Sequence, residues 1–94
     1  MKITGLIWLA EIVDKIQEKH GVSQQEVREI FARRPFFRFV EKGHRRGENV
    51  YAALGQTESG RYLVVFFVYK KNGQALVLSA RDMTRAERRL YEQR

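Results

Sequence analysis

Residues 62–80 read YLVVFFVYKKNGQALVLSA, and this stretch decides the fold. Its first part, Tyr62–Tyr69, is an uncharged run of β-branched and aromatic residues, which is typical of a strand at the centre of a sheet. Asn72-Gly73 is a dipeptide that tight hairpin turns favour, so the chain is expected to return as a second strand over residues 75–80. The stretch therefore predicts an antiparallel hairpin.

Two further strands are expected before this hairpin. Residues 36–40 read FFRFV, and residues 50–56 read VYAALGQ, followed by a turn around Glu58-Ser59-Gly60. Because the connections between these strands are short, the four strands are expected to form an antiparallel sheet with the helices on one face. Residues 3–8 (ITGLIW) are apolar enough for a short strand or for the beginning of the first helix, and the pattern leaves both open.

Two helices are expected in the N-terminal third of the chain. From Leu9, apolar residues recur at positions 9, 12, 13 and 16, which is helical spacing, and Gly21 can end that helix in the left-handed conformation. Ser23 and Glu26 form a capping box that opens the next helix. Pro35 ends it, because the residue before a proline is pushed out of the helical region.

A last helix is expected near the C-terminus, since Thr84 and Glu87 form a second capping box. The predicted fold class is therefore α+β, with two N-terminal helices, a four-stranded antiparallel sheet and a C-terminal helix. The chain has 94 residues and a mass of 11.1 kDa, which fits a single domain over residues 1–94.

The composition excludes several classes of function. Without cysteine there is no disulfide, thiolate metal site or cysteine nucleophile. The longest uncharged apolar run has eight residues, far below the ~20 that span a bilayer. Charged residues interrupt the N-terminal segment, so no signal peptide is expected and the expected location is the cytoplasm. A net charge of +7 instead indicates an acidic partner such as nucleic acid.

Most of this positive charge lies in residues 33–46, which read RRPFFRFVEKGHRR and hold six cations against one acid. Arginine suits phosphate, because its guanidinium group can donate two parallel hydrogen bonds to phosphate oxygens. The functional interpretation is that this segment contacts an RNA or DNA backbone. The alternative is a solvated rim whose phenylalanines, Phe36, Phe37 and Phe39, fill the core.

The residues that could carry chemistry favour acid–base cleavage of RNA, in which the substrate's own 2′-hydroxyl is the nucleophile. His20 and His44 are the two histidines and lie far apart in the chain, so no metal site and no cofactor are expected. His44 and Glu48 are candidate proton acceptors beside the basic segment, and Tyr51 is a candidate donor. Positive charge would stabilise the phosphorane.

Several segments resemble the BrnT-type toxins. They are Lys19-His20-Gly21-Val22-Ser23 with Glu26 and Phe31, then Gly60-Arg61, Ser79-Ala80-Arg81, Glu87-Arg88 and Tyr91, with an early tryptophan at Trp8. The resemblance covers nearly the whole chain in order and spacing. It implies a RelE-like fold and a bacterial type II toxin–antitoxin pair, in which the toxin is a metal-independent ribonuclease that inhibits translation.

The resemblance also implies a partner, and together with the basic segment and the α+β frame it leads to a hypothesis about the site residues. The partner would be a DNA-binding antitoxin, BrnA, which neutralises the toxin in a hetero-oligomer. Arg81 and Arg61 are expected to stabilise the scissile phosphate, while His44 or Glu48, with Tyr51, moves protons. The residues expected to bind RNA are Lys42, Arg45, Arg46, Arg38 and Lys19.

The chain departs from the BrnT pattern at five positions. Leu9 stands where an acidic residue is usual, and Ile12 and Ile16 replace a lysine and an asparagine. Val50 and Leu76 stand where two arginines are expected on strands. Losing these cations would weaken phosphate stabilisation unless other residues substitute for them, namely Lys42, Arg45, Arg46 and Arg61.

Two other classes of function therefore stay open. The first is a catalytically weak or inactive module on the same fold, which binds nucleic acid or an acidic protein through the same surface. The second is a structural domain whose charge serves solubility, although charge concentrated in one segment suits that purpose poorly.

Overall fold

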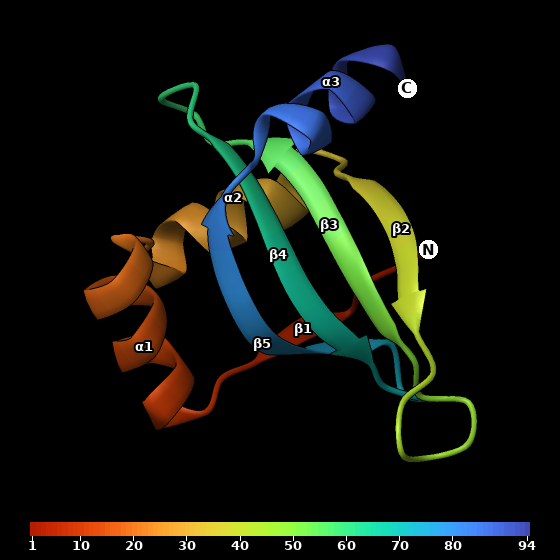
Figure 1. Cartoon of the computed structure of the whole chain (residues 1–94). Coiled ribbons are helices and arrows are strands. Elements are labelled where there is room, and N and C mark those ends of the chain that lie inside the picture. The colour runs from red at the N-terminus through yellow and green to blue at the C-terminus, as the bar shows by residue number, and fades with distance from the viewer.

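The computed structural model describes residues 1–94 and has an α+β fold with three helices and a five-stranded mixed sheet in the order β1-β5-β4-β3-β2 (Figure 1). The strands are β1 (Gly5–Ile7), β2 (Phe36–Glu41), β3 (Val50–Gln56), β4 (Tyr62–Tyr69) and β5 (Gln74–Asp82). The helices are α1 (Ala10–His20), α2 (Gln24–Ala32) and α3 (Arg85–Gln93). None of these helices is both long and apolar enough to cross a membrane.

The expectation of four antiparallel strands is wrong in one respect, because β1 is a fifth strand and pairs in parallel with β5. In the register, Leu6 lies opposite Ala75 and Ile7 opposite Leu76. A segment of three residues is too short to show an alternating pattern in the sequence. Gly5–Ile7 forms a strand because it can pair with the free edge of β5. The other three pairings, β2 with β3, β3 with β4 and β4 with β5, are antiparallel as predicted.

The predicted helix boundaries are confirmed where a cap defines them. Both capping boxes are complete, from Ser23 to Glu26 at α2 and from Thr84 to Glu87 at α3. Gly21 closes α1 with φ +60°, in the left-handed region that glycine enters without strain. These local hydrogen bonds satisfy backbone groups that a helix end leaves free.

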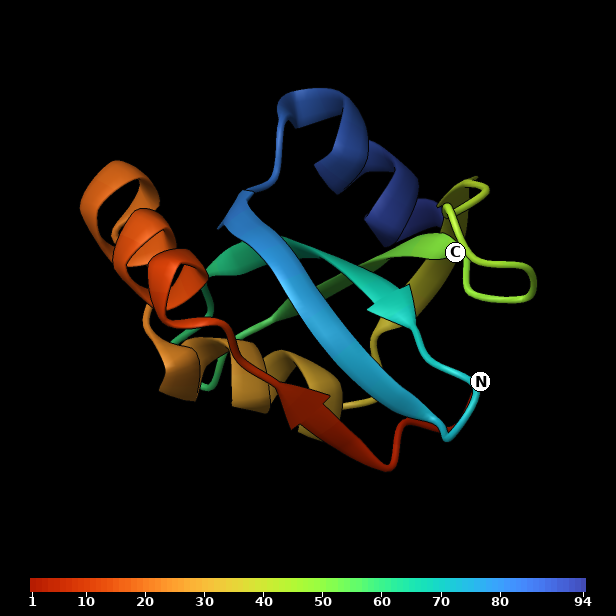
Figure 2. The same ribbon diagram turned by 90° about the horizontal axis from the view of Figure 1, so that it is seen from below.

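The sheet separates two layers (Figure 2). One face packs against α1 and α2 and holds the larger core cluster, in which Phe67 and Ile16 are among the largest fully buried side chains. The helices contribute Ile16, Val27 and Ile30 to this cluster, and the connection between α1 and α2 contributes Val22. The strands contribute Ala53, Leu63, Val65, Phe67, Ala75, Val77 and Ala80.

The expectation that the helices share one face is wrong, because α3 covers one end of the opposite face (Figure 2). Tyr91 of α3 packs there with Leu54 and Val64 in a second, smaller cluster. At the other end of the same face, near the end of β4 and the beginning of β5, no helix covers the sheet (Figure 1). Val68 and Leu76, in these parts of the two strands, have half-buried side chains. This uncovered end is where a substrate could reach the sheet.

Candidate functional site

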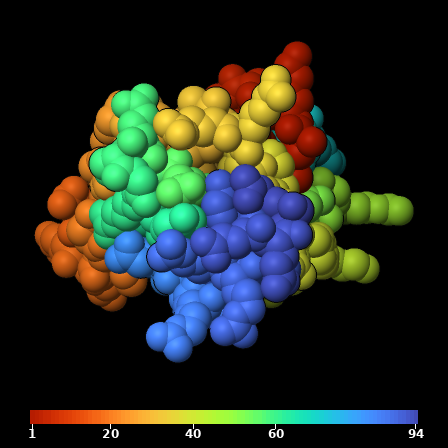
Figure 3. All heavy atoms as spheres, turned by 90° about the horizontal axis from the view of Figure 1, so that it is seen from above, coloured from red at the N-terminus to blue at the C-terminus, as the bar shows by residue number.

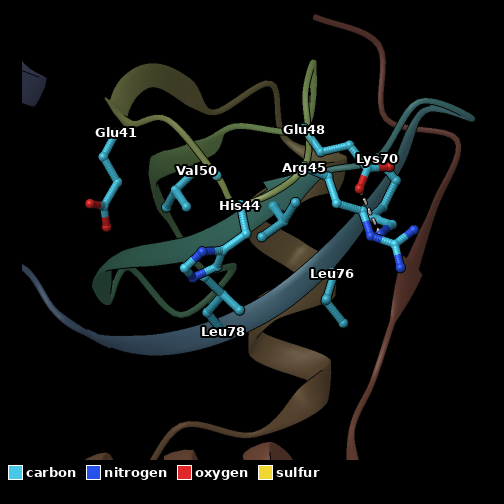
Figure 4. A pocket seen from close by; sticks show the side chains of 10 residues that line it. Glu41, His44, Arg45, Glu48, Val50, Lys70, Leu76 and Leu78 are labelled. Carbon is cyan, nitrogen blue, oxygen red and sulfur yellow. Dashed lines mark hydrogen bonds and ion pairs between the residues drawn. The ribbon is translucent and has the colours of Figure 1, made fainter.

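A cavity of about 390 Å³ lies on the uncovered end of the α3 face (Figure 4). Its floor is an apolar row that crosses three strands, because Val50, Val68 and Leu76 are paired in register on β3, β4 and β5. Leu78 extends the floor along β5. Val50 and Leu76, two positions at which the BrnT resemblance leads one to expect arginine, therefore lie in the same pocket.

The polar rim of this pocket comes from the loop between β2 and β3 and from the ends of neighbouring strands. His44 projects from the loop on the side of Leu78, whereas Arg45 lies towards Lys70 (Figure 4). Glu41, at the end of β2, lines the pocket on the other side of His44. The rim thus combines an imidazole, two cations (Arg45 and Lys70) and two carboxylates (Glu41 and Glu48) above a floor that carries no charge.

Glu48 fastens this loop to the sheet. Its Oε1 accepts from Lys70 Nζ at 3.0 Å and its Oε2 from the backbone N–H of Lys71 at 3.3 Å. The hydrogen bond from Lys70 is the largest cause of a lowered Glu48 pKa, so the carboxylate is ionised at neutral pH. Both carboxylate oxygens of Glu48 accept hydrogen bonds and the residue is only 8% exposed, so Glu48 holds the loop in place.

Gly43 allows the loop to close. A Cβ at this position would collide with the backbone carbonyl oxygen of Glu48. The Gly43 N–H instead donates to Asn49 Oδ1 at 3.4 Å. A side chain at residue 43 would therefore displace the loop that carries His44 and Arg45.

Arg81 lies on the same face of the sheet as the pocket, but at the opposite end of that face, where it pairs with Val64 of β4. Val64 and Val68 are four positions apart along β4, which corresponds to about 13 Å. Two hydrogen bonds of 2.7 and 3.0 Å join the Arg81 guanidinium to Glu87, and that interaction is the largest cause of a raised Arg81 pKa. Arg81 thus ties β5 to the N-terminal turn of α3.

Arg61 lies at the beginning of β4, on the side of the sheet that α1 and α2 cover. Its guanidinium donates to the backbone oxygens of His20 and Gly21 at 2.9 and 2.7 Å. It also bonds Asp82, at 2.8 and 3.1 Å, and Glu26, at 3.3 Å. Arg61 joins the end of α1, the beginning of α2 and the end of β5.

The structure therefore does not bring the expected catalytic residues into one pocket. Arg61 and Arg81 point to opposite faces of the sheet, and Arg61 is separated from the pocket by the length of β4, roughly 23 Å. Tyr51 also points to the α1–α2 face, where its ring stacks on Phe67 with centroids 6.1 Å apart. Of the expected catalytic residues, His44 and Glu48 line the pocket.

The residues expected to bind RNA separate into two groups. Lys42, Arg45 and Arg46 are exposed on the loop that borders the pocket. Arg38 is exposed on the adjacent edge strand, whereas Lys19 is in the last turn of α1, away from the loop. Long side chains from the yellow-green part of the chain, around β2 and this loop, stand away from the molecule in Figure 3.

Lys15 is a residue near the site that sequence reasoning missed. Its Nζ donates to the backbone oxygen of Leu78 at 3.1 Å, so an ammonium group lies beside the β5 wall of the pocket. Its position in the sequence could have indicated this role: Lys15 follows Ile12 by three residues, at the border of the apolar stripe of α1, where a lysine stem can lie along the core and carry its ammonium group outwards. No group of three or more histidine, aspartate or glutamate side chains is positioned to hold a metal ion.

One family model matches the chain over residues 8–87, and it describes the ribonuclease toxin BrnT of type II toxin–antitoxin systems. No curated protein matches the chain. The matched region extends from Trp8 to Glu87, so it includes the whole sheet from β2 to β5, the pocket and the loop that carries His44. The chain therefore belongs to the BrnT family, the ribonuclease toxins of type II toxin–antitoxin systems.

Proposed function

We propose that this protein is a toxin that cleaves RNA without a metal ion, thereby inhibits translation, and is neutralised by a BrnA-like antitoxin in a hetero-oligomer. The observation that carries the proposal is the pocket on the open end of the α3 face. It combines His44 and Arg45 with a border of exposed cations, in a family of ribonuclease toxins.

In the proposed reaction, His44 removes the proton of a 2′-hydroxyl. An imidazole can accept and release protons near neutral pH, which suits this role. The 2′-oxygen then attacks the adjacent phosphorus, the bond to the 5′-oxygen breaks, and that oxygen takes a proton from water. The products are a 2′,3′-cyclic phosphate and a 5′-hydroxyl end.

Arg45 and Lys15 are the cations proposed to stabilise the phosphorane. Arg45 lines the pocket on the side of Lys70, and the Lys15 ammonium donates to the backbone oxygen of Leu78, a residue of the β5 wall. Preorganised positive charge at such a position stabilises the developing oxyanions. Lys42 and Arg46, exposed on the same loop, are proposed to hold neighbouring phosphates.

The remaining expected catalytic residues receive different roles in the proposal. Glu48 anchors the loop through Lys70 and so positions His44. Arg61 and Arg81 hold the frame together, because protein acceptors already occupy their guanidinium groups. Tyr51 belongs to the aromatic core of the other face.

The apolar floor favours a second candidate function. Val50 and Leu76 supply no charge where a scissile phosphate would lie, so the same surface could bind RNA without cleaving it. Binding of that kind depends steeply on salt, because each phosphate contact releases counterions. A binding module would therefore show this salt dependence while leaving the RNA intact.

The test is degradation of RNA by the purified full chain, free of any partner and in EDTA. We expect cleavage that persists in EDTA and falls roughly a hundredfold in His44→Ala, the lower end of what a general acid–base residue contributes. Arg45→Ala is expected to slow cleavage as well. Arg28→Ala, which removes an exposed arginine from α2 on the other side of the sheet, is the matched control. Intact RNA at micromolar protein would contradict the enzymatic proposal.

A further inference from the structure

The outer edge of β2 exposes apolar side chains that the pocket does not explain. Phe39 is 56% exposed and Val40 is 43% exposed, and β2 has a neighbour, β3, on one side only. An edge strand also leaves alternate backbone N–H and C=O groups without a partner in the sheet. The other edge of the sheet is different, because β1 has only three residues and all are half-buried.

A hollow of about 330 Å³ lies beside this edge, between β2 and α3. Val40 and Arg38 border it on the strand side, and Leu90 borders it on the helix side. Phe66 of β4 also lines this hollow. Glu87 lines the hollow too, but its carboxylate is paired with Arg81, so side chains of an added strand that point to this face would meet apolar walls and the exposed Arg38.

The positive charge around β2 favours an acidic segment as the binding partner of this edge. Arg33, Arg34, Arg38 and Lys42 lie on or beside the strand, and Glu41 is the one acid of the segment. Two copies of this chain paired edge to edge would bring like charges together, which destabilises cross-strand pairs. An acidic segment would remove that repulsion.

We propose that the outer edge of β2 binds an extended segment of a partner protein in which acidic and apolar residues alternate, so that the segment adds a strand to the sheet. Main-chain hydrogen bonds to β2 supply part of the affinity. Because successive side chains of a strand point to opposite faces of the sheet, the apolar side chains of the segment lie beside Phe39 on the α1–α2 face and its acidic side chains lie beside Arg38 on the α3 face. In this family such a partner is the antitoxin, so the identity of the partner rests on the proposed function.

This position also explains how a partner would neutralise the pocket. The loop that carries His44 and Arg45 begins directly after β2, at residue 42. Glu41, the last residue of the strand, already lines the pocket. A segment seated along β2 therefore ends beside the mouth of the pocket and can cover it.

The experiment titrates the ¹⁵N-labelled full chain with a short acetylated and amidated peptide of alternating valine and glutamate. Amide shifts are expected along β2 and at the residues that line the hollow, with saturation below about 1 mM. The same peptide with lysine in place of glutamate, and one N-methylated at alternate residues, are expected not to bind. Arg38→Glu is expected to weaken binding roughly fivefold to tenfold, and Arg28→Glu on α2 is the matched control.

Other outcomes would overturn the proposal. The proposal is wrong if the peptide causes no amide shifts up to about 1 mM, or only shifts at the pocket floor. It is also wrong if the lysine peptide binds equally well, or if an RNA oligonucleotide shifts the β2 amides and the peptide does not. Concentration-dependent shifts of β2 in the free protein would indicate a second copy instead. Lys42→Glu provides a second charge reversal if Arg38→Glu fails to fold. Because the titration involves no cleavage, its failure is distinguishable from a failure of the ribonuclease proposal.

Discussion

Replacing Arg61 with alanine separates the structural role of this residue from the phosphate-binding role that the sequence indicated. The guanidinium joins two carbonyl oxygens at the end of α1 with two carboxylates, on α2 and at the end of β5. Arg61→Ala removes all four connections at once. We therefore predict a large loss of stability and no change at the pocket, which lies at the far end of β4.

The magnitude follows from these partners. A hydrogen bond of this kind contributes a net 0.5–1.5 kcal/mol, and a partly exposed ion pair contributes about 0.2–1 kcal/mol. Asp82 is 63% exposed on its side chain, so its ion pair belongs at the low end of that range. Together the four connections stabilise the fold by about 2–4 kcal/mol. For a domain of this size that is a decrease in Tm of roughly 10–25 °C.

Part of this stability depends on pH with a defined sign. The hydrogen bond from Arg61 is the largest cause of the lowered pKa of Asp82, whose ordinary value is 3.8. A lowered carboxyl pKa adds stability that is present above the ordinary pKa and is lost as pH falls through the folded-state value. The difference between wild type and Arg61→Ala is therefore complete at pH 7 and narrows below about pH 4, while the part due to the carbonyl bonds remains.

Thermal unfolding followed by circular dichroism measures this difference, and RNA binding by the folded variant is measured below its Tm. Arg61→Lys is the control for charge, because an ammonium group keeps the cation and loses the planar fork. It is expected to recover only a minor part of the Tm. An unchanged Tm together with lost RNA binding in Arg61→Ala would refute the reasoning and restore Arg61 as a phosphate ligand.

Three other predictions concern the loop, the pocket floor and α3. Glu48→Gln loses the ion pair that fastens the loop, so trypsin is expected to cut faster after Arg45, and an unchanged rate of proteolysis would contradict the anchoring role. Leu76→Arg adds a cation to the pocket floor and is expected to raise the rate of RNA cleavage. It is also expected to steepen the slope of log K for RNA binding against log salt concentration by about one. Equal rates and slopes in wild type and variant would count against the pocket as the RNA site. Thr84→Ala removes the N-cap of α3 and is expected to cost about 1 kcal/mol in denaturant unfolding, with Ser23→Ala at α2 as the comparison.

The parts of the fold that local chemistry determines were predictable from the sequence. The strands β3 and β4 begin and end at the predicted residues, Val50–Gln56 and Tyr62–Tyr69. Both capping boxes and the cap at Gly21 use residues close together in the chain. β1 was not predictable as a strand, because its pairing with β5 depends on two segments about seventy positions apart.

The candidate site was predictable in part, for a related reason. The concentration of charge in residues 33–46 indicated the loop with His44 and Arg45, and that loop borders the pocket. The roles of Arg61 and Arg81 depend on which carboxylates the fold brings near them. The register that sets Asp82 opposite Leu63 brings its carboxylate to the Arg61 guanidinium, and no local pattern reveals that pairing.

The positions of Val50 and Leu76 bear on how this member of the family could act. Both are positions where the BrnT resemblance leads one to expect arginine, and Val68 joins them into one continuous row of the pocket floor. The fold thus keeps these two positions together in one pocket although neither residue is cationic. Any chemistry in this pocket must therefore come from its rim, where His44 and Arg45 lie. Whether RNA is cleaved or only bound then depends on this rim, which is why Leu76→Arg and His44→Ala are expected to change the rate in opposite directions.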